Sequence, residues 1–287
     1  ADTIMAETEK GRREMSEAAK APETAMPVLL REDKGAIATL TLNRPKARNS
    51  LSEELMQAVL GEVEKIGADP DLKVIVLKAN GPGFCAGHDL KELTAARTEG
   101  DKGRAYYARI MKLCSRMMQA IVQCPKPVIA QVHGIATAAG CQLVASCDLA
   151  VAAHEAKFAT PGVNIGLFCS TPMVALSRNV TRKHAMEMLL LGEMIEAARA
   201  AEFGLINRAV SADTLEAEVE KMAATIAAKS RLTVEIGKTA FYEQLEKRLG
   251  DAYDYASDVM VHNMLARDAE EGIGAFIEKR DPVWENR

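Results

Sequence analysis

The sequence predicts an α/β fold with a helical C-terminal region. Short apolar runs such as "KVIVLKA" and "DLAVAA" have the length of buried strands, and they alternate with segments whose apolar residues recur at helical spacing. From about Thr181 to the end, helical spacing dominates. A chain of 287 residues, 48% of them hydrophobic, can bury a large core. Because no linker-like stretch divides it, we expect one continuous unit.

The first predicted element is a half-buried strand, "AIATLTLN", which ends at Asn43. A helix follows in "SLSEELMQAVLGEVEKIG", where Ser50 or Ser52 can cap the N-terminus and residues 55, 59 and 63 form an apolar face. "KVIVLKA" contains four consecutive apolar residues and therefore has no polar face. This pattern predicts a strand that is buried on both sides.

The same rhythm then repeats. A helix is predicted from about Gly103 to Gln123, followed by the strand "KPVIAQVHG", a helix of small residues from about Ala138, and the strand "DLAVAA". Further along, the pattern predicts one strand, "INRAV", and five helical segments: "RKHAMEMLLLG", "IEAARAAEFG", "DTLEAEVEKMAATIAAKS", "RLTVEIGKTAFYEQLEKRL" and "RDAEEGIGAFIEK".

Composition and charge exclude several classes of protein. A net charge of -4 without a long basic tract argues against nucleic acid as the main ligand. No apolar run reaches the roughly 18 residues that a membrane-spanning helix needs, and the N-terminus lacks the layout of a secretory signal. The six cysteines are scattered without CxxC spacing, as expected in a reducing compartment. We therefore expect a soluble protein of the bacterial cytoplasm or the mitochondrial matrix.

Residues 1–26 are rich in Ala, Glu, Lys and Arg and poor in large apolar residues. This composition predicts a solvated extension with some helical tendency. The ordered part of the chain is expected to begin near Val28.

Two loops combine small and apolar residues directly after predicted strands: "FCAGHDL", residues 84–90, and "HGIATAAGCQL", residues 133–143. A glycine turn between a strand and a helix leaves backbone N–H groups unpaired, and these suit a negatively charged oxygen. If the two loops meet, one N–H from each could hold a carbonyl oxygen that becomes an enolate or oxyanion. Because such turns occur throughout α/β proteins, the spacing alone leaves a purely structural role open.

Four blocks of sequence, in order, cover roughly residues 28–284: "NRPKARNSLS", "GPGFCAGHDLKEL", "KPVIAQVHGIATAAGCQLVASCDLAVAAHEAKFATPGVNIGL" and "FIEKRDPVW". Together they resemble the crotonase (enoyl-CoA hydratase/isomerase) superfamily. The resemblance implies a spiral core of ββα turns over residues 27–200 and a C-terminal helical trimerisation region over residues 201–287. It also implies acyl-CoA thioester substrates and homotrimers, often paired into homohexamers.

The resemblance places the oxyanion hole at the backbone N–H groups of His88 and Ala139. The hydratases of this family use two glutamates that activate water and deliver a proton to the α-carbon. Those positions correspond here to Gln142 and Gly162, neither of which takes up a proton near neutral pH. Hydration by the two-glutamate route is therefore not expected. The family's glycine triplet reads "AAG" in this chain, so the second donor requires an alanine with suitable φ and ψ.

The resemblance also places the adenine of CoA between the "PKAR" turn and the "HDLK" segment. The candidates there are Lys46, Ala47, Arg48, Asp89, Leu90 and Lys91. The basic side chains would supply cations for the nucleotide phosphates. Phe276 and Lys279 match positions that, in the family, contact the CoA bound to a neighbouring subunit. Coenzyme A enters as part of the substrate, and we expect neither a tightly bound cofactor nor a metal.

Other reactive side chains are interpreted mainly as structural. The pKa of histidine suits general acid/base work, but the side chain of His88 faces away from the thioester if the residue forms the oxyanion turn. Asp89 is interpreted as a cap rather than a base. Cys169 is interpreted as an unreactive thiol near the acyl end, because no base that would lower its pKa is identifiable. By resemblance, Asn164 and Ser170 lie in the same segment.

The remaining candidates fit the core. His133 and His154 lie near Cys141 and Cys147 in sequence, but their irregular spacing argues against a zinc site. Asp148 begins a buried strand and is interpreted as a structural cap or ion-pair partner. Three methionines of the predicted helix after the first loop are interpreted as core residues, with an acyl-pocket role implied by resemblance: Met111, Met117 and Met118.

Two main functional hypotheses follow. In the first, the protein is an acyl-CoA enzyme that keeps the oxyanion hole but performs isomerisation, decarboxylation or thioester hydrolysis rather than ordinary hydration. In the second, it binds acyl-CoA without catalysis. A genuine hydratase that uses other residues stays as an alternative, and a serine hydrolase is the most remote one because no Ser/His/Asp set is evident.

Overall fold

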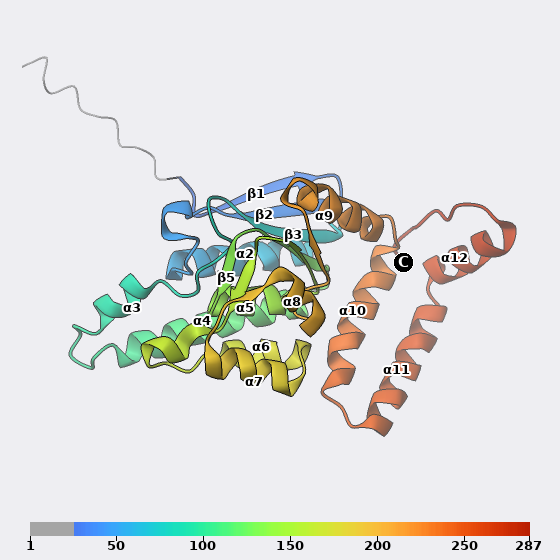
Figure 1. The fold of residues 1–287 in the computed structure, drawn as a ribbon. Coiled ribbons are helices and arrows are strands. Elements are labelled where there is room, and N and C mark those ends of the chain that lie inside the picture. The colour runs from blue at the N-terminus through green and yellow to red at the C-terminus, as the bar shows by residue number, and fades with distance from the viewer. Residues whose placement is uncertain (1–25) are drawn as a thin grey trace, which may run out of the picture.

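The computed structural model describes residues 26–287, so the predicted N-terminal extension lies outside the described residues except for Met26. The centre of the fold is a six-stranded sheet (Figure 1). Its strands, in spatial order, are β1 (Leu29–Lys34), β2 (Ile37–Leu42), β3 (Val74–Ala79), β4 (Val128–Val132), β6 (Leu149–Ala153) and β9 (Arg208–Val210). The first pair is antiparallel and the other four pairs are parallel.

Helices cover both faces of this sheet. The larger apolar core lies under α2 (Glu53–Ala68), α4 (Arg104–Gln123) and α5 (Ala139–Ser146). A smaller core on the opposite face lies under α9 (Ala212–Ala227). The strand β3 contributes alternate residues to the two cores, and its first four residues are each at most 5% exposed. The prediction of an α/β fold with a strand buried on both sides is therefore confirmed.

A second, three-stranded sheet lies beside the first, with the order β5 (Ile135–Thr137), β7 (Lys157–Ala159) and β8 (Ile195–Glu196). Short helices complete the body: η1 (Pro45–Ala47), α3 (Leu90–Ala96), η2 (Pro161–Ile165), α6 (Pro172–Asn179), α7 (Arg182–Leu191) and α8 (Ala197–Phe203). The cap of α2 is Ser52, whose hydroxyl accepts a hydrogen bond from the N–H of Leu55 at 3.2 Å. The structure thereby decides between the two predicted capping serines.

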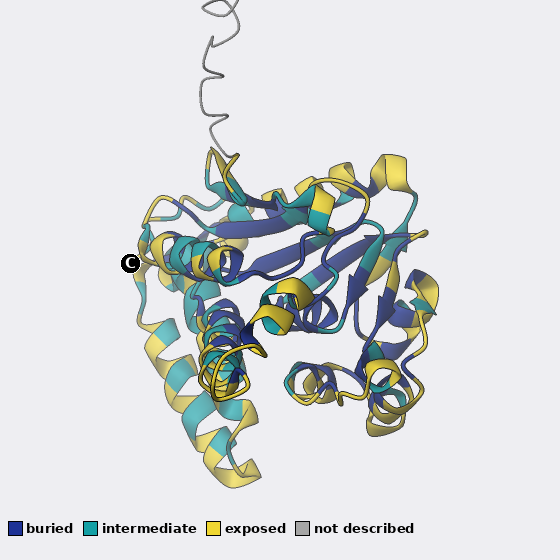
Figure 2. Cartoon of the chain, turned by 90° about the vertical axis from the view of Figure 1, so that its left-hand side faces the viewer, coloured by how far each residue is buried: buried dark blue, intermediate teal, exposed yellow. Residues whose placement is uncertain are grey.

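The last three helices extend away from the body: α10 (Arg231–Leu245), α11 (Leu249–Met264) and α12 (Arg267–Glu278) (Figure 1). Over residues 231–264, neither α10 nor α11 has a buried residue, and Figure 2 shows this hairpin in the colours of intermediate and exposed residues. Large apolar side chains are exposed on these helices, including Phe241, Leu245, Leu249, Tyr253, Met260, Val261, Phe276 and Ile277. The single chain therefore leaves this apolar surface uncovered.

A cluster of polar side chains attaches α10 to the sheet. The ammonium group of Lys238 lies 2.7 Å from the carboxylate of Asp148, which also accepts from the hydroxyl of Tyr242 at 2.9 Å and from the N–H of Val128 at 2.7 Å. Lys238 also donates to two backbone carbonyl oxygens. The side chains of Lys238 and Asp148 are only 6% and 15% exposed. Asp148 therefore has a structural role, in line with its interpretation from sequence.

The predicted division between residues 200 and 201 falls inside α8. Beyond it, β9 completes the main sheet and α9 covers that sheet's second face. The chain leaves the body only at α10. Within residues 26–287, no helix is both long and apolar enough to cross a membrane.

Candidate functional site

The two loops singled out in the sequence lie in contact. Cys85 of the first loop pairs with Ala136 of the second in a parallel bridge, and the N–H of Thr137 donates to the carbonyl oxygen of Cys85 at 2.9 Å. Gly140 lies so close to the same carbonyl that any Cβ on it would overlap with the oxygen. The parallel strands β3 and β4 end at the same edge of the sheet, and this brings their following loops together.

The backbone N–H groups of His88 and Ala139 face no acceptor within the described part of the chain. They are close to each other, because a Cβ on Gly87, the residue before His88, would lie 3.3 Å from the amide nitrogen of Ala139. Ala139 is the first residue of α5, where N–H groups have no partner inside the helix. Two free donors therefore lie close together, which is the arrangement that an oxyanion hole would need.

The "AAG" triplet has a strained start. Ala138 has φ 51° and ψ -118°, a conformation that favours glycine, and its N–H donates to the carbonyl oxygen of Ala159 at 2.9 Å. Ala139 itself adopts helical geometry. Alanine at the second position therefore leaves the donor N–H in place, and the strain falls on the residue before it.

Gln142 follows one turn into α5 and is 5% exposed. Its N–H donates to Ala138, whereas its side-chain oxygen Oε1 is buried without a hydrogen-bond partner among residues 26–287. Residues three apart lie on one face of a helix, so the side chain of Gln142 lies on the same face of α5 as that of Ala139, one turn after the free N–H. The side chain of Gln142 also lines a cavity of about 330 Å³ between α4, α5 and α6.

Gly162 lies in η2 and has no room for a side chain. A Cβ there would lie 2.7 Å from the carbonyl oxygen of Leu167 and 2.9 Å from the Sγ of Cys169. Burial raises the pKa of the Cys169 thiol, which keeps it protonated. The sequence marked Gly162 as a position without a carboxylate, and the structure adds that the space for one is filled.

The imidazole of His88 is unsuited to proton transfer at neutral pH. Burial lowers the pKa of His88 to about 4, and neither ring nitrogen finds a partner in the described residues. The ring is therefore neutral at pH 7. The backbone N–H of His88 is free, whereas its two ring nitrogens are buried.

The turn that contains Lys46, Ala47 and Arg48 lies against the segment that contains Asp89, Leu90 and Lys91. Leu51 makes a parallel bridge to His88, donating to Gly87 at 2.8 Å and accepting from Asp89 at 3.1 Å. The guanidinium of Arg44 lies 2.9 Å from the carboxylate of Asp89.

Asp89 also caps α3 by accepting from the N–H of Lys91 at 3.0 Å. Its hydrogen bonds lower the pKa of Asp89 against the opposing effect of burial. Asp89 is therefore a capping residue that stays ionised. Lys46 and Arg48 are exposed at this surface, and Leu90 is 56% exposed beside them.

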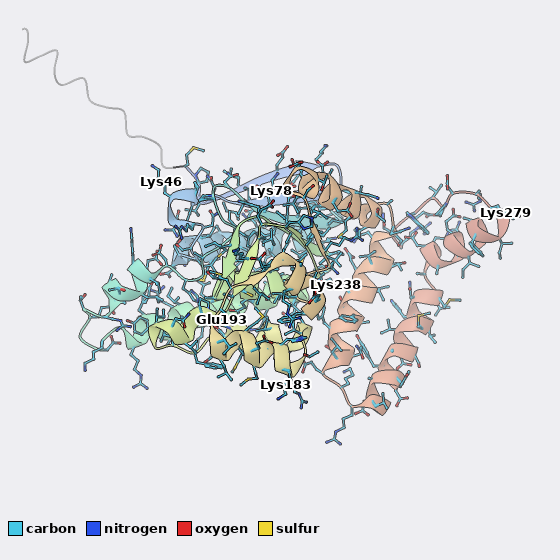
Figure 3. All side chains as sticks on the ribbon, viewed as in Figure 1. Lys46, Lys78, Lys183, Glu193, Lys238 and Lys279 are labelled. Carbon is cyan, nitrogen blue, oxygen red and sulfur yellow. The ribbon has the colours of Figure 1, made fainter. Side chains whose placement is uncertain are left out.

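Phe276 and Lys279 lie elsewhere. Figure 3 shows Lys46 and Lys279 at opposite sides of the molecule. Phe276, near the end of α12, is 84% exposed. One chain therefore does not bring its two sets of predicted CoA-contacting residues together.

The other candidates have local structural partners. The side-chain amide of Asn164 donates to the carbonyl oxygen of Gly192 at 3.2 Å. The hydroxyl of Ser170 donates to the carbonyl oxygen of Phe168 at 3.3 Å. All six cysteines fall within the described residues and are buried free thiols. Over residues 26–287, no three His, Cys, Asp or Glu side chains are grouped so that they could hold a metal ion.

Two charged residues at the cavity were not foreseen. Arg178 of α6 and Glu246, directly after α10, line the same cavity as Gln142 and form an ion pair at 3.3 Å. Their separation of 68 residues leaves no local pattern that could have indicated the pair. Arg44 was missed for the same reason, since its partner Asp89 is 45 residues away.

Comparison with known proteins agrees with this architecture. The sequence model of the enoyl-CoA hydratase/isomerase family matches residues 32–287. The protein named enoyl-CoA hydratase domain-containing protein 3, mitochondrial, of Rattus norvegicus is 47% identical over 263 residues, which cover 92% of this chain and 86% of the rat protein. Its namesake in Homo sapiens is 49% identical over 248 residues, covering 86% of this chain and 80% of the human protein.

Two crystal structures are similar over nearly their whole length. An enoyl-CoA hydratase of Mycobacterium smegmatis has a TM-score of 0.86 and 50% identity, covering 90% of this chain and 99% of that one. The human enoyl-CoA hydratase domain-containing protein 3 has a TM-score of 0.85 and 47% identity, covering 90% and 100%. The predicted crotonase-like spiral with C-terminal helices is thereby confirmed, and the chain belongs to the enoyl-CoA hydratase/isomerase family.

Proposed function

We propose that this protein binds acyl-CoA thioesters and polarises the thioester carbonyl with the backbone N–H groups of His88 and Ala139. The CoA nucleotide would lie along the surface formed by residues 46–48 and 89–91. The thioester oxygen would accept both hydrogen bonds and would be stabilised further as negative charge develops on it. Coenzyme A is thus part of the substrate, with no separate cofactor proposed.

One observation carries this proposal. Two N–H groups from loops about fifty residues apart lie next to each other without an acceptor among the described residues. Leaving a buried donor unpaired costs roughly 1–3 kcal/mol, so a fold that keeps two of them at one point favours a ligand oxygen there. The N-terminus of α5 adds a positive partial charge at the same place.

The residues beside these donors argue against hydration by two glutamates. Gln142 can orient a water or a carbonyl group, but its amide cannot accept a proton near neutral pH. Gly162 offers no side chain, and its surroundings leave no space for one. The chemistry that fits is isomerisation, decarboxylation or thioester hydrolysis, because each develops charge on the oxygen that the two donors hold.

Two alternatives are supported by specific observations. The buried, neutral His88 and the missing carboxylates favour an acyl-CoA-binding protein without catalysis. Glu246 is the single carboxylate among the residues that line the cavity beside Gln142, and it would be the candidate acid of a hydratase that uses other residues.

Assembly into trimers or hexamers is part of the same proposal. Exposed apolar side chains cover α10, α11 and α12, and burying such a surface against a second copy is favourable. Phe276 and Lys279 would then reach the CoA of a neighbouring subunit. The rat and human relatives are named mitochondrial, so the mitochondrial matrix joins the bacterial cytoplasm as a proposed location.

The test combines binding with turnover. Pure protein would be incubated with enoyl-, malonyl- and saturated acyl-CoAs while product formation and thermal stabilisation are followed together. Stabilisation with turnover supports an enzyme, and stabilisation without turnover across the panel supports the binding protein. No stabilisation by any thioester would refute the proposal.

A matched pair of variants tests the donor site. Gly87→Ala would crowd the position between the two donors, where a Cβ meets Ala138 at 2.9 Å and the nitrogen of Ala139 at 3.3 Å. Gly35→Ala has a similarly positive φ but nothing within 4 Å. We expect only Gly87→Ala to abolish thioester stabilisation. Equal loss in both variants would mean that backbone strain, and not the donor site, is responsible.

A further inference from the structure

The cavity beside Gln142 has polar groups at its two ends. Gln142 marks the inner end because it is 5% exposed, and its Oε1 is buried without a partner in the described residues. Arg178 and Glu246 mark the outer end, with side chains 58% and 70% exposed. Between them the wall includes Met118, Val122, Val174 and Ala175. The lining also includes the polar residues Ser115, Gln119, Gln123, Ser146 and Thr171. The cavity is therefore a partly apolar space between Gln142, which follows the proposed donor Ala139 by one helical turn, and a charged rim.

The ion pair at the rim is incomplete. Both contacts of Arg178 with Glu246 involve the same carboxylate oxygen, at 3.3 and 3.4 Å, and a third contact goes to the carbonyl oxygen of Val174 at 3.3 Å. A guanidinium has five N–H donors and binds a carboxylate best with two parallel short bonds. A long, exposed pair of this kind contributes little free energy. A second carboxylate could therefore displace Glu246 or share Arg178 with it.

The position of Glu246 makes such displacement feasible. It follows α10 directly, at the far end of a hairpin whose two helices have no buried residue over residues 231–264. Two further cations, Arg182 and Lys183, are exposed within five residues of Arg178, and Figure 3 shows Lys183 on α7. The outer end of the cavity thus has unused guanidinium donors.

From this arrangement we infer that the acyl group of the substrate ends in a carboxylate, which Arg178 binds. This inference rests on the proposed function and narrows its substrate class to CoA monothioesters of dicarboxylic acids. The methylenes of such an acyl group would lie along the aliphatic wall, and the free carboxylate would reach the rim. A plain fatty acyl chain of equal length would instead place a methyl group near Arg178, with no hydrogen bond to offer its remaining donors.

The experiment compares acyl groups that differ only at their far end. Dissociation constants would be measured by calorimetry for glutaryl-CoA against valeryl-CoA, and for adipoyl-CoA against hexanoyl-CoA, with CoA alone as reference. We expect the carboxylate-ended thioester of at least one pair to bind about tenfold more tightly, as a charge-assisted hydrogen bond would give. Arg178→Gln should abolish this preference, while Glu246→Gln should increase it. Arg199→Gln, which breaks an exposed ion pair away from the cavity lining, should leave it unchanged.

The outcomes separate this inference from the proposed function. Equal or weaker binding of both carboxylate-ended thioesters to the wild-type protein refutes the inference while leaving the proposed function intact. A preference that survives Arg178→Gln also refutes it. If no thioester binds at all, the proposed function is wrong and the inference falls with it.

Discussion

Gly162 packs so closely against Cys169 that a Cβ on the glycine would lie 2.9 Å from the thiol sulfur. The carbonyl oxygen of Leu167 is closer still, at 2.7 Å, and a backbone atom cannot move aside as a flexible side chain can. The residue that resemblance marks as lacking a glutamate is therefore enclosed by its own loop. Restoring a hydratase by substitution at this position would require the loop to rearrange.

The first prediction concerns this packing. Gly162→Ala should lower the free energy of unfolding by about 1–3 kcal/mol, because an added methyl group overpacks the site. Gly61→Ala in α2 is the control, since nothing lies within 4 Å of the added Cβ. It should stabilise the helix by about 0.5–1 kcal/mol. Urea unfolding of both variants tests the prediction, and a Gly162→Ala protein as stable as the wild type would contradict it.

The second prediction places a base near the proposed oxyanion hole. Gln142→Glu introduces a carboxylate in α5 one turn after Ala139. It should accelerate exchange of the α-protons of butyryl-CoA in D₂O by about tenfold or more, because a positioned base gives at least that factor. Mass spectrometry of the recovered thioester measures the exchange.

Two controls accompany this variant. Gln57→Glu adds the same charge on α2, outside the cavity, and should show no exchange above the wild type. Combining Gln142→Glu with Gly87→Ala should remove the gain. If Gln142→Glu binds butyryl-CoA but exchanges no protons, residue 142 does not face the α-carbon.

The third prediction concerns pH. Burial lowers the pKa of His88 to about 4 in the folded protein, below its value of 6.5 in an unfolded chain. The unfolded chain therefore takes up the proton first as the pH falls. The contribution of the neutral imidazole to the free energy of unfolding is full above pH 6.5 and is lost as the pH falls towards 4. Between pH 7.5 and 5.0, the wild type should lose about 2 kcal/mol more stability than His88→Gln.

This difference would be measured by urea unfolding of both proteins at the two pH values. His88→Gln keeps the backbone N–H, so it changes the titration without removing the proposed donor. The same pH dependence in both proteins would show that the imidazole is solvated and that the burial argument is wrong.

The fourth prediction concerns the attachment of α10. Lys238→Met leaves the carboxylate of Asp148 without its ammonium partner in a mostly buried position, and this should cost about 3 kcal/mol. Tyr242→Phe removes one hydrogen bond to the same carboxylate and should cost about 1 kcal/mol. Lys247→Met breaks an ion pair with the exposed Glu243 and should leave stability almost unchanged. Similar losses for Lys238→Met and Lys247→Met would contradict the structural role of Asp148.

Local patterns in the sequence predicted the helices and strands whose apolar residues recur at a regular spacing. The apolar run of β3 and the capped, amphipathic α2 are both observed, because burial on one or both faces imposes that spacing. One strand was missed for the converse reason. β1 is an edge strand whose last four residues are exposed, so it has no apolar face turned to the core. The helix α11 was also missed, although α10, which likewise has no buried residue, was predicted.

The sequence by itself determined the fold class, the family resemblance, the two glycine loops and the absence of carboxylates at residues 142 and 162. These depend on residue type and short-range order. The tertiary structure alone decided that the N–H groups of His88 and Ala139 meet, that Gly162 has no space for a side chain, that His88 is neutral, and that Arg178 and Glu246 share the cavity of Gln142. The two donors come together because the parallel strands β3 and β4 end at one edge of the sheet, and the ion pair joins residues 68 positions apart. Gly162 is crowded by the path of its own loop, which residue types alone do not reveal.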